Sequence, residues 1–96
     1  MLIRFFASIR NVTGERQIEW QERTPTLGEL LHRLADSYGP EFRRWVLDGE
    51  RLGSAVMIVV NGEDVRPKAG LQTRLAPTDV VSILPVMAGG RPREAP

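Results

Sequence analysis

The chain has 96 residues, 42% of them hydrophobic and 26% charged, which is the balance of one small globular domain. Its 13 basic and 12 acidic residues are interleaved and leave a formal charge of +1, so we expect no nucleic-acid partner. With no cysteine and a single histidine, His32, the composition excludes disulfides, thiolate metal sites, cysteine nucleophiles and multi-histidine metal sites. No apolar run approaches the ~20 residues that cross a bilayer, and the N-terminal residues lack a signal-peptide core, so we expect a cytoplasmic protein with no membrane partner.

The N-terminal residues predict a β-hairpin. Residues 2–8 combine β-branched and aromatic side chains with partial alternation, which is typical of a strand. Alternation places Phe6 on the same face as Arg4, so the Phe6 ring is expected on a partly exposed surface. A turn signal at residues 11–14 leads into a second alternating strand at residues 16–22.

The clearest predicted element is a helix of about three turns that begins after Thr26. Thr26 and Glu29 fit a capping box, in which each side chain reaches the other residue's backbone amide. One apolar stripe at helical spacing follows, and it contains Leu27, Leu30, Leu31, Leu34, Ala35 and Tyr38. Gly39 and Pro40 end the helix. His32 lies off the stripe and is interpreted as a surface residue rather than a catalytic one.

The segment after the helix predicts a short helical turn at residues 42–46 and then a loop at residues 48–51. Residues 55–60 form a continuous apolar run, which predicts a strand covered on both faces. Asn61 and Gly62 are the strongest short hairpin signal, because both positions tolerate positive φ. They lead into a short charged strand.

Residues 80–84 predict the last strand of the sheet. Alternation places Val81 and Ile83 on one face and Leu84 on the other. Leu84 therefore joins Phe6 as an apolar residue on a face partly open to solvent.

The order of elements is strand, strand, helix, strand, short strand, last strand. A right-handed crossover places the strand after the helix parallel to a strand of the hairpin. The predicted fold class is α+β: a β-grasp (ubiquitin-like) mixed sheet with one main helix packed on one face.

The chain ends with a slim segment in which Met87 and Ala88 lead to the pair Gly89-Gly90, followed by residues 91–96. Two adjacent glycines add no packing energy and cost backbone entropy. Without Cβ atoms, however, the main chain can thread a narrow channel and bring its carbonyl close to another molecule's chemistry. Taken alone, the pair also fits an ordinary flexible terminus.

Several stretches resemble the MoaD/ThiS family of ubiquitin-like sulfur carriers. Residues 5–14 resemble the opening of the molybdopterin synthase small subunit, MoaD, and residues 26–31 and 79–90 fit the same family. Residues 60–66, with the Ile-Leu-Pro-x-x-Ala-Gly-Gly ending, resemble the CysO-type branch that carries sulfur for cysteine synthesis. The resemblance covers residues 1–90.

The resemblance implies a carrier with no bound cofactor rather than an enzyme, or the small subunit of a molybdopterin synthase-type enzyme. An E1-like partner of the MoeB/ThiF type adenylates the carboxylate of Gly90 with ATP. Sulfur then displaces AMP and leaves a thiocarboxylate, which a sulfur-accepting synthase consumes. Gly90 is the reacting residue, and Ala88 and Gly89 keep the tail slim enough to enter the partner.

The predicted docking surface for the E1-like partner is an apolar patch formed by Phe6, Leu84 and Met87. The alternative is that Phe6 is an ordinary core residue.

The sequence departs from the family pattern at its end, because residues 91–96 follow the glycine that should be terminal. We therefore expect a β-grasp sulfur-carrier domain at residues 1–90 and a removable flexible tail at residues 91–96. Some members of the family are cut after Gly-Gly by a JAMM-type zinc metalloprotease, and the two prolines in the tail disfavour regular structure that would block a protease. The alternatives are an artificial extension or a member that has lost carrier chemistry.

Three functions stay open from the sequence. The first is a sulfur carrier for cysteine or molybdopterin synthesis. The second is a protein modifier, in which an amine captures the same activated glycine. The third is an inert β-grasp interaction domain, since a fold does not fix a function.

Overall fold

A computed structural model of the chain describes residues 1–86. The predictions for Met87, Ala88, Gly89 and Gly90, and for residues 91–96, lie outside the described residues.

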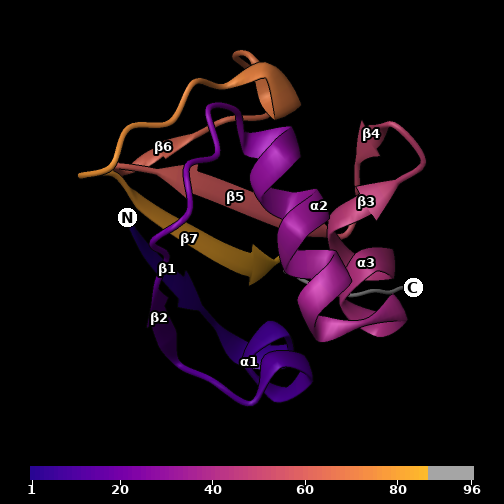
Figure 1. The fold of residues 1–96 in the computed structure, drawn as a ribbon. Coiled ribbons are helices and arrows are strands. Elements are labelled where there is room, and N and C mark those ends of the chain that lie inside the picture. The colour runs from indigo at the N-terminus through magenta and orange to yellow at the C-terminus, as the bar shows by residue number, and fades with distance from the viewer. Residues whose placement is uncertain (87–96) are drawn as a thin grey trace.

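The described part of the chain is built on a five-stranded mixed sheet with helices on one side (Figure 1). Across the sheet the strands are β2 (Gln17–Glu19), β1 (Leu2–Phe5), β7 (Val80–Pro85), β5 (Val56–Val60) and β6 (Glu63–Asp64). The pair β1–β7 is parallel, and the other three pairs are antiparallel. The last strand of the chain is therefore the central strand of the sheet, as a β-grasp fold requires.

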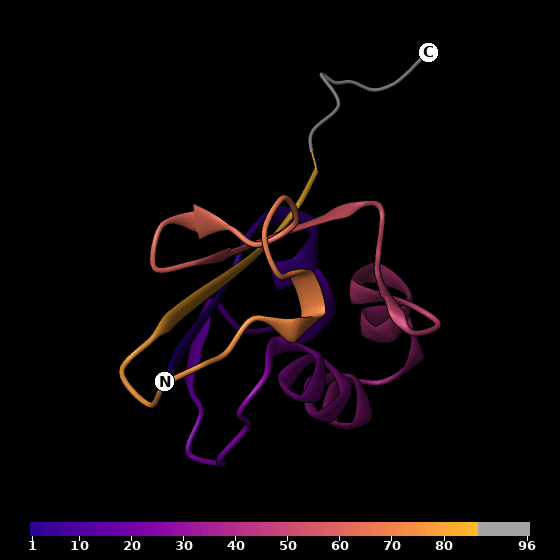
Figure 2. The same ribbon diagram turned by 90° about the horizontal axis from the view of Figure 1, so that it is seen from above.

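The main helix, α2 (Leu27–Tyr38), confirms the predicted apolar stripe. The Thr26 hydroxyl accepts a hydrogen bond from the Glu29 backbone amide at 3.3 Å. The Glu29 carboxylate instead binds Arg33 one turn later, at 3.2 Å, so only half of the predicted capping box forms. Helix α2 and the short helix α3 (Pro40–Val46) lie on the same side of the sheet, as the view from above shows (Figure 2). No described helix is long and apolar enough to cross a membrane.

The core lies between the sheet and these helices. Its fully buried side chains come from every layer and include Ile3, Phe5, Ile9, Leu27, Leu30, Leu31, Leu34, Phe42, Val46, Val56, Ile58, Val81 and Ile83. Phe5 contacts Tyr38 and Phe42 edge-on, with ring centroids 5.7 and 6.1 Å apart, a geometry that aromatic pairs favour.

The predicted strand over residues 2–8 is wrong beyond Phe5, because a short helix, α1 (Ala7–Thr13), replaces its end. The backbone turns after Phe6, and this turn buries Ile9 completely in the core. Gly14 closes the helix in the left-handed conformation, with φ 75°. The predicted antiparallel pairing of the first two strands is confirmed, but α1 connects them in place of a short turn at residues 11–14. The second strand, predicted at residues 16–22, covers only Gln17–Glu19.

The predicted helical turn at residues 42–46 is confirmed as α3, but the loop predicted next is a small hairpin. Its strands are β3 (Leu47–Asp48) and β4 (Arg51–Leu52), and Gly49 at the turn has φ 64°. Gly53 follows β4, and a Cβ added there would lie 2.3 Å from the Trp45 carbonyl oxygen. The chain therefore folds back at a place where only glycine fits.

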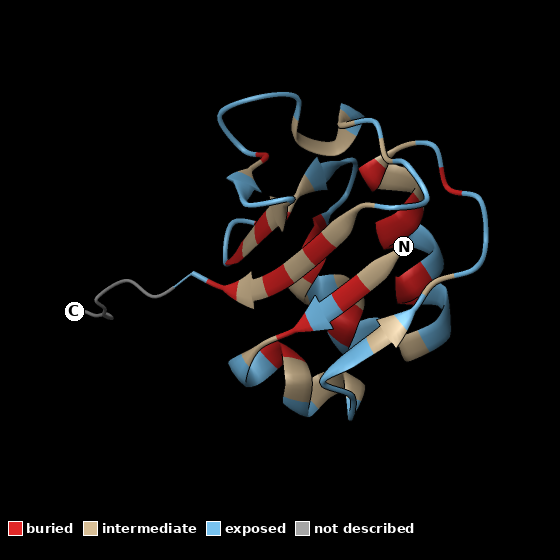
Figure 3. Cartoon of the chain, turned by 90° about the vertical axis from the view of Figure 1, so that its left-hand side faces the viewer, coloured by how far each residue is buried: buried red, intermediate tan, exposed pale blue. Residues whose placement is uncertain are grey.

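The Asn61-Gly62 turn is confirmed, with φ of 51° and 88° at its two residues, and it joins β5 to β6. The strand β5 runs in the same direction as β2, as a right-handed crossover predicts, but it pairs with β7 rather than with the hairpin. The predicted coverage of β5 on both faces is wrong. Val56 and Ile58 are buried, whereas Met57 and Val59 are only partly covered, and buried and half-buried residues alternate along the strands (Figure 3).

The burial of Leu31 predicts a large effect on stability. Leu31→Ala should lower the free energy of unfolding by about 2–5 kcal/mol, because it leaves a cavity in the core. Ser37→Ala, at an exposed position of the same helix, is the control and should change it by less than about 0.5 kcal/mol. Denaturant titration measures both changes. A loss below about 1 kcal/mol for Leu31→Ala would mean that the apolar stripe of α2 does not pack in the core.

Candidate functional site

The first part of the candidate site is the end of the central strand, where the chain leaves the sheet. The Phe6 backbone amide binds the Ile83 carbonyl at 3.1 Å on one side of β7. On the other side, the Val86 amide binds the Ala55 carbonyl at 2.8 Å. Val86, the last described residue, has 42% of its surface exposed. The chain is thus held on both sides as far as Ile83 and on the β5 side as far as Val86.

A hollow of about 320 Å³ lies beside this exit, lined by Glu41, Arg44, Trp45 and Ala55. Ala55 is also the residue that binds the Val86 amide. Sequence reasoning missed this hollow because its lining comes from α3 and from the start of β5. Only the fold brings these segments together.

The second part is the face of the sheet that α2 does not cover, which we call the open face. Leu84 lies directly opposite Met57 in the β5–β7 pairing, and both are half-buried. Phe6 continues β1 in an extended conformation, one residue beyond the pairing of Phe5 with Ile83, so it lies beside Leu84. We call Phe6, Met57 and Leu84 the open-face patch.

Arg4 adds a positive charge at the edge of the open-face patch. Its guanidinium lies over the Phe6 ring, 5.4 Å from the ring centroid, which is a cation–π distance. Arg4 remains exposed, so its charge is available to an acidic group on a partner. The combination fits a partner surface with an apolar centre and an acidic residue beside it.

The structure brings the predicted residues Phe6 and Leu84 together, while Met87, Ala88, Gly89 and Gly90 lie outside the described residues. Sequence reasoning missed Met57, because its continuous apolar run predicts a strand covered on both faces. A methionine within that run was the available signal, since methionine is common on adaptable binding surfaces.

His32 is exposed, as the sequence predicts. Its Nδ1 lies 3.4 Å from an Arg43 guanidinium nitrogen, and Arg43 also binds Asp36 at 2.6 Å. A catalytic histidine needs a nucleophile or a substrate-facing cavity beside it, and this surface cluster offers neither. Within residues 1–86, no group of three or more His, Asp or Glu side chains could hold a metal ion.

The sheet order, the covering helix and the exit of the chain from the central strand define a ubiquitin-like β-grasp protein. A chain in the crystal structure of the Amycolatopsis orientalis BexX/CysO complex superposes with a TM-score of 0.76 and 27% sequence identity. The match covers 93% of this chain and 98% of that one. The predicted fold class is confirmed.

The ThiS family model matches residues 3–90, and the chain belongs to this family. It is 36% identical over 89 residues to small archaeal modifier protein 3 of Haloferax volcanii, covering 92% of this chain and 96% of that protein. It is 41% identical over 68 residues to the sulfur carrier protein CysO of Mycobacterium tuberculosis, covering 68% of this chain and 72% of that one. The relatives of this chain are therefore named both as sulfur carriers and as modifiers.

We predict that substitutions in the open-face patch weaken partner binding but change the stability of the fold little. If the open-face patch is the predicted docking surface, Leu84→Asp and Phe6→Lys should each weaken the complex with an E1-like partner about tenfold or more, because each places a charge in an apolar contact. The free energy of unfolding should fall by less than about 1 kcal/mol, since both side chains are only half-buried. Titration calorimetry and denaturant titration give the two readouts.

Ser37→Glu, a new charge on the exposed side of α2, is the matched control and should leave both quantities unchanged. If stability fell in step with affinity for Phe6→Lys, that residue would belong to the core instead.

Proposed function

We propose that this chain is a sulfur carrier. After trimming, the terminal carboxylate of Gly90 is adenylated by an E1-like enzyme and converted to a thiocarboxylate that donates sulfur in biosynthesis. The chain supplies the acyl group and the docking surface, and the partner supplies ATP and the catalytic residues.

The observation that carries the proposal is the course of β7. It runs through the centre of the sheet and is hydrogen-bonded on the β1 side as far as Ile83 and on the β5 side as far as Val86, four residues before Gly90 in the sequence. A glycine pair contributes no side-chain packing energy, but its lack of Cβ atoms suits entry into a narrow site. The relationship to CysO, a sulfur carrier by name, supports the same interpretation.

The chemistry needs two steps, because a carboxylate is a poor acyl donor. The Gly90 carboxylate attacks the α-phosphorus of ATP, and pyrophosphate leaves as the acyl adenylate forms. A sulfide ion (HS⁻) from the partner system then attacks the carbonyl carbon, AMP leaves with the bonding electron pair, and the sulfur loses its proton to solvent. The product is a thiocarboxylate, whose sulfur is nucleophilic.

The short distance between the sheet and Gly90 limits where the partner can dock. Four residues span at most about 14 Å when fully extended. The partner's ATP site must therefore lie within about that distance of Val86. The open-face patch is next to this exit through Leu84, so it is the surface that we assign to the E1-like enzyme.

Trimming is the step that makes Gly90 reactive. An internal Gly90 carbonyl belongs to an amide, which has no carboxylate to attack ATP. Removing residues 91–96 takes away two arginines and one glutamate, leaving 11 basic (13 minus 2) and 11 acidic (12 minus 1) residues. The proposed protease is of the JAMM type, which the family resemblance implies, and glycine allows the close access to the scissile carbonyl that a hydrolytic zinc needs.

Cysteine synthesis is the pathway that the CysO relationship supports, with a sulfur-accepting synthase as the second partner. The molybdopterin pathway is the alternative, in which the chain would act as a small synthase subunit. Both pathways use the same tail chemistry, and both are consistent with a cytoplasmic protein.

The test compares the 96-residue chain with versions that end at Gly90 and at Gly89, each incubated with an E1-like enzyme, ATP and a sulfur source. Only the version that ends at Gly90 should gain roughly 16 Da, the mass of an oxygen-to-sulfur exchange, as measured by intact-protein mass spectrometry. The version ending at Gly89 is the control for position. If the untrimmed chain gained the same mass without cleavage, the terminal-glycine mechanism would be wrong.

A second candidate function is protein modification, which the relationship to small archaeal modifier protein 3 favours. In that reaction a lysine amine, rather than sulfur, displaces AMP and forms an amide. Lys68 is the only lysine of this chain. Its ammonium binds the Glu63 carboxylate at 2.6 Å and lowers the pKa of Glu63. The amine would have to leave this ion pair before it could attack.

We therefore expect no chains of this protein linked through Lys68. Peptide mapping after incubation with ATP and the E1-like enzyme should find no Lys68–Gly90 branched peptide, and Lys68→Arg should give the same products as the unchanged chain. A branched peptide that disappears in Lys68→Arg would establish conjugation and overturn the sulfur-only interpretation.

A further inference from the structure

The segment that leads into β5 holds the exit of the chain from the sheet. The Ala55 carbonyl, just before β5, accepts the hydrogen bond from the Val86 amide at 2.8 Å. On the β1 side, the described residues hold β7 only as far as Ile83. The position of the Ala55 carbonyl therefore decides where the C-terminal segment starts.

The other edge of β5 lacks a backbone donor at the same place. After β6, the backbone bonds to β5 end with the one from the Val65 amide to the Ile58 carbonyl, at 3.1 Å. In an antiparallel pair the next bond on the same edge forms two residues further along each strand, which here means the Val56 carbonyl and residue 67. Residue 67 is Pro67, which has no amide hydrogen. The backbone therefore cannot supply a donor for the Val56 carbonyl.

The side chain of Arg66 supplies the missing donor. Its Nη2 nitrogen donates to the Val56 carbonyl at 2.7 Å and also to the Gly53 carbonyl at 2.6 Å. Both accepting residues are buried, and a buried carbonyl without a partner destabilises the fold. Hydrogen bonds from a charged donor are roughly twice as strong as those between neutral groups. The guanidinium thus continues the hydrogen bonding of β5 where Pro67 interrupts it.

Gly53 is held from its other side by the end of α3. Its amide binds the Val46 carbonyl at 2.9 Å, and a Cβ at this position would collide with the Trp45 carbonyl. Arg66 therefore binds a residue that is already fixed, two positions before Ala55, and a second residue directly after Ala55. The Ala55 carbonyl lies between these two points and is held in place by both.

We propose that Arg66 is a positioning residue for the reaction of Gly90. By holding the carbonyls on either side of Ala55, it fixes the Ala55 carbonyl and, through it, Val86. This role rests on the proposed function, in which the partner's ATP site must meet Gly90 four residues beyond Val86. Arg66 acts through Ala55 rather than through the open-face patch. Its loss should therefore lower the rate of adenylation rather than the affinity for the E1-like enzyme, since misplacement of a reacting group slows the chemical step.

Amide hydrogen exchange of the free 96-residue chain, followed by NMR, tests the positioning without any partner. Arg66→Gln should speed exchange of the Val86 amide about tenfold or more, because the loss of hydrogen bonds from a charged group releases the Ala55 carbonyl. Arg51→Gln is the matched control, since Arg51 lines the same shallow hollow as Arg66 and loses the same charge. It should leave the exchange of the Val86 amide unchanged.

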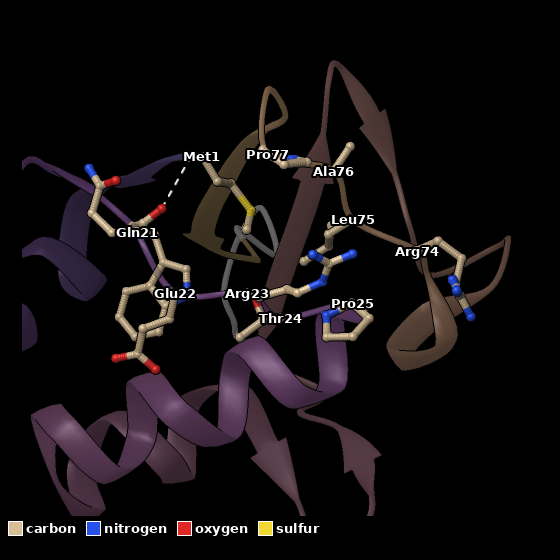
Figure 4. Close-up of a pocket in the computed structure, with 11 residues that line it drawn as sticks. Met1, Gln21, Glu22, Arg23, Thr24, Pro25, Arg74, Leu75, Ala76 and Pro77 are labelled. Atoms are coloured by element: carbon tan, nitrogen blue, oxygen red, sulfur yellow. Dashed lines mark hydrogen bonds between the residues drawn. The ribbon is translucent and has the colours of Figure 1, made fainter.

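Two further amides show whether the effect is confined to the exit. The first is the Phe6 amide, which binds the Ile83 carbonyl on the β1 side of β7. The second is the Leu75 amide, which binds the Pro25 carbonyl at 2.9 Å in the segment that leads into β7 (Figure 4). In Arg66→Gln both should exchange within about twofold of their rates in the unchanged chain, because neither bond involves the segment before β5.

Steady-state kinetics of adenylation separate positioning from docking. The version that ends at Gly90 is the varied substrate, and pyrophosphate release by the E1-like enzyme with ATP is the readout. Arg66→Gln should lower kcat about tenfold and leave KM for the carrier within about twofold, because the open-face patch is unchanged. Leu84→Asp, in the patch, should instead raise KM. Arg51→Gln should change neither quantity.

The proposal is overturned if Arg66→Gln leaves the exchange of the Val86 amide or kcat unchanged, or if all three amides speed up equally, since Arg66 would then act on the whole fold. A rise in KM with unchanged kcat would assign Arg66 to docking instead. An equal effect of Arg51→Gln would mean that only the positive charge matters. If the unchanged version ending at Gly90 is not adenylated, the proposed function is wrong, while the exchange of the Val86 amide still decides whether Arg66 fixes the exit.

Discussion

The pairing of β7 on both sides is the constraint on which the rest of the molecule depends. Parallel bonds to β1 and antiparallel bonds to β5 place the last strand of the chain at the centre of the sheet. A central strand is the hardest part of a sheet to displace, because both of its edges must be released together. Val86 therefore has a fixed position relative to the sheet. A partner that binds the sheet consequently meets the start of the C-terminal segment at a defined place.

Side chains alternate along β7, so that one set of residues belongs to the core and the other set belongs to the open face. Ile83 is fully buried under the helices, while its neighbour Leu84 lies on the open face opposite Met57. A shift of the strand by one residue would exchange these two faces and would also move the exit of the chain. The buried positions of β7 thus fix the register that the open-face patch and the tail both need.

The sequence was sufficient for elements whose signals are local. The apolar stripe of α2, the Asn61-Gly62 turn and the alternation of β7 all predict what the structure contains. The helix α1 was not predictable in the same way, because its burial rests on Ile9 alone and the preceding residues favour a strand. The hollow beside the chain exit was also hidden, since its lining residues on α3 and at Ala55 are brought together only by the fold.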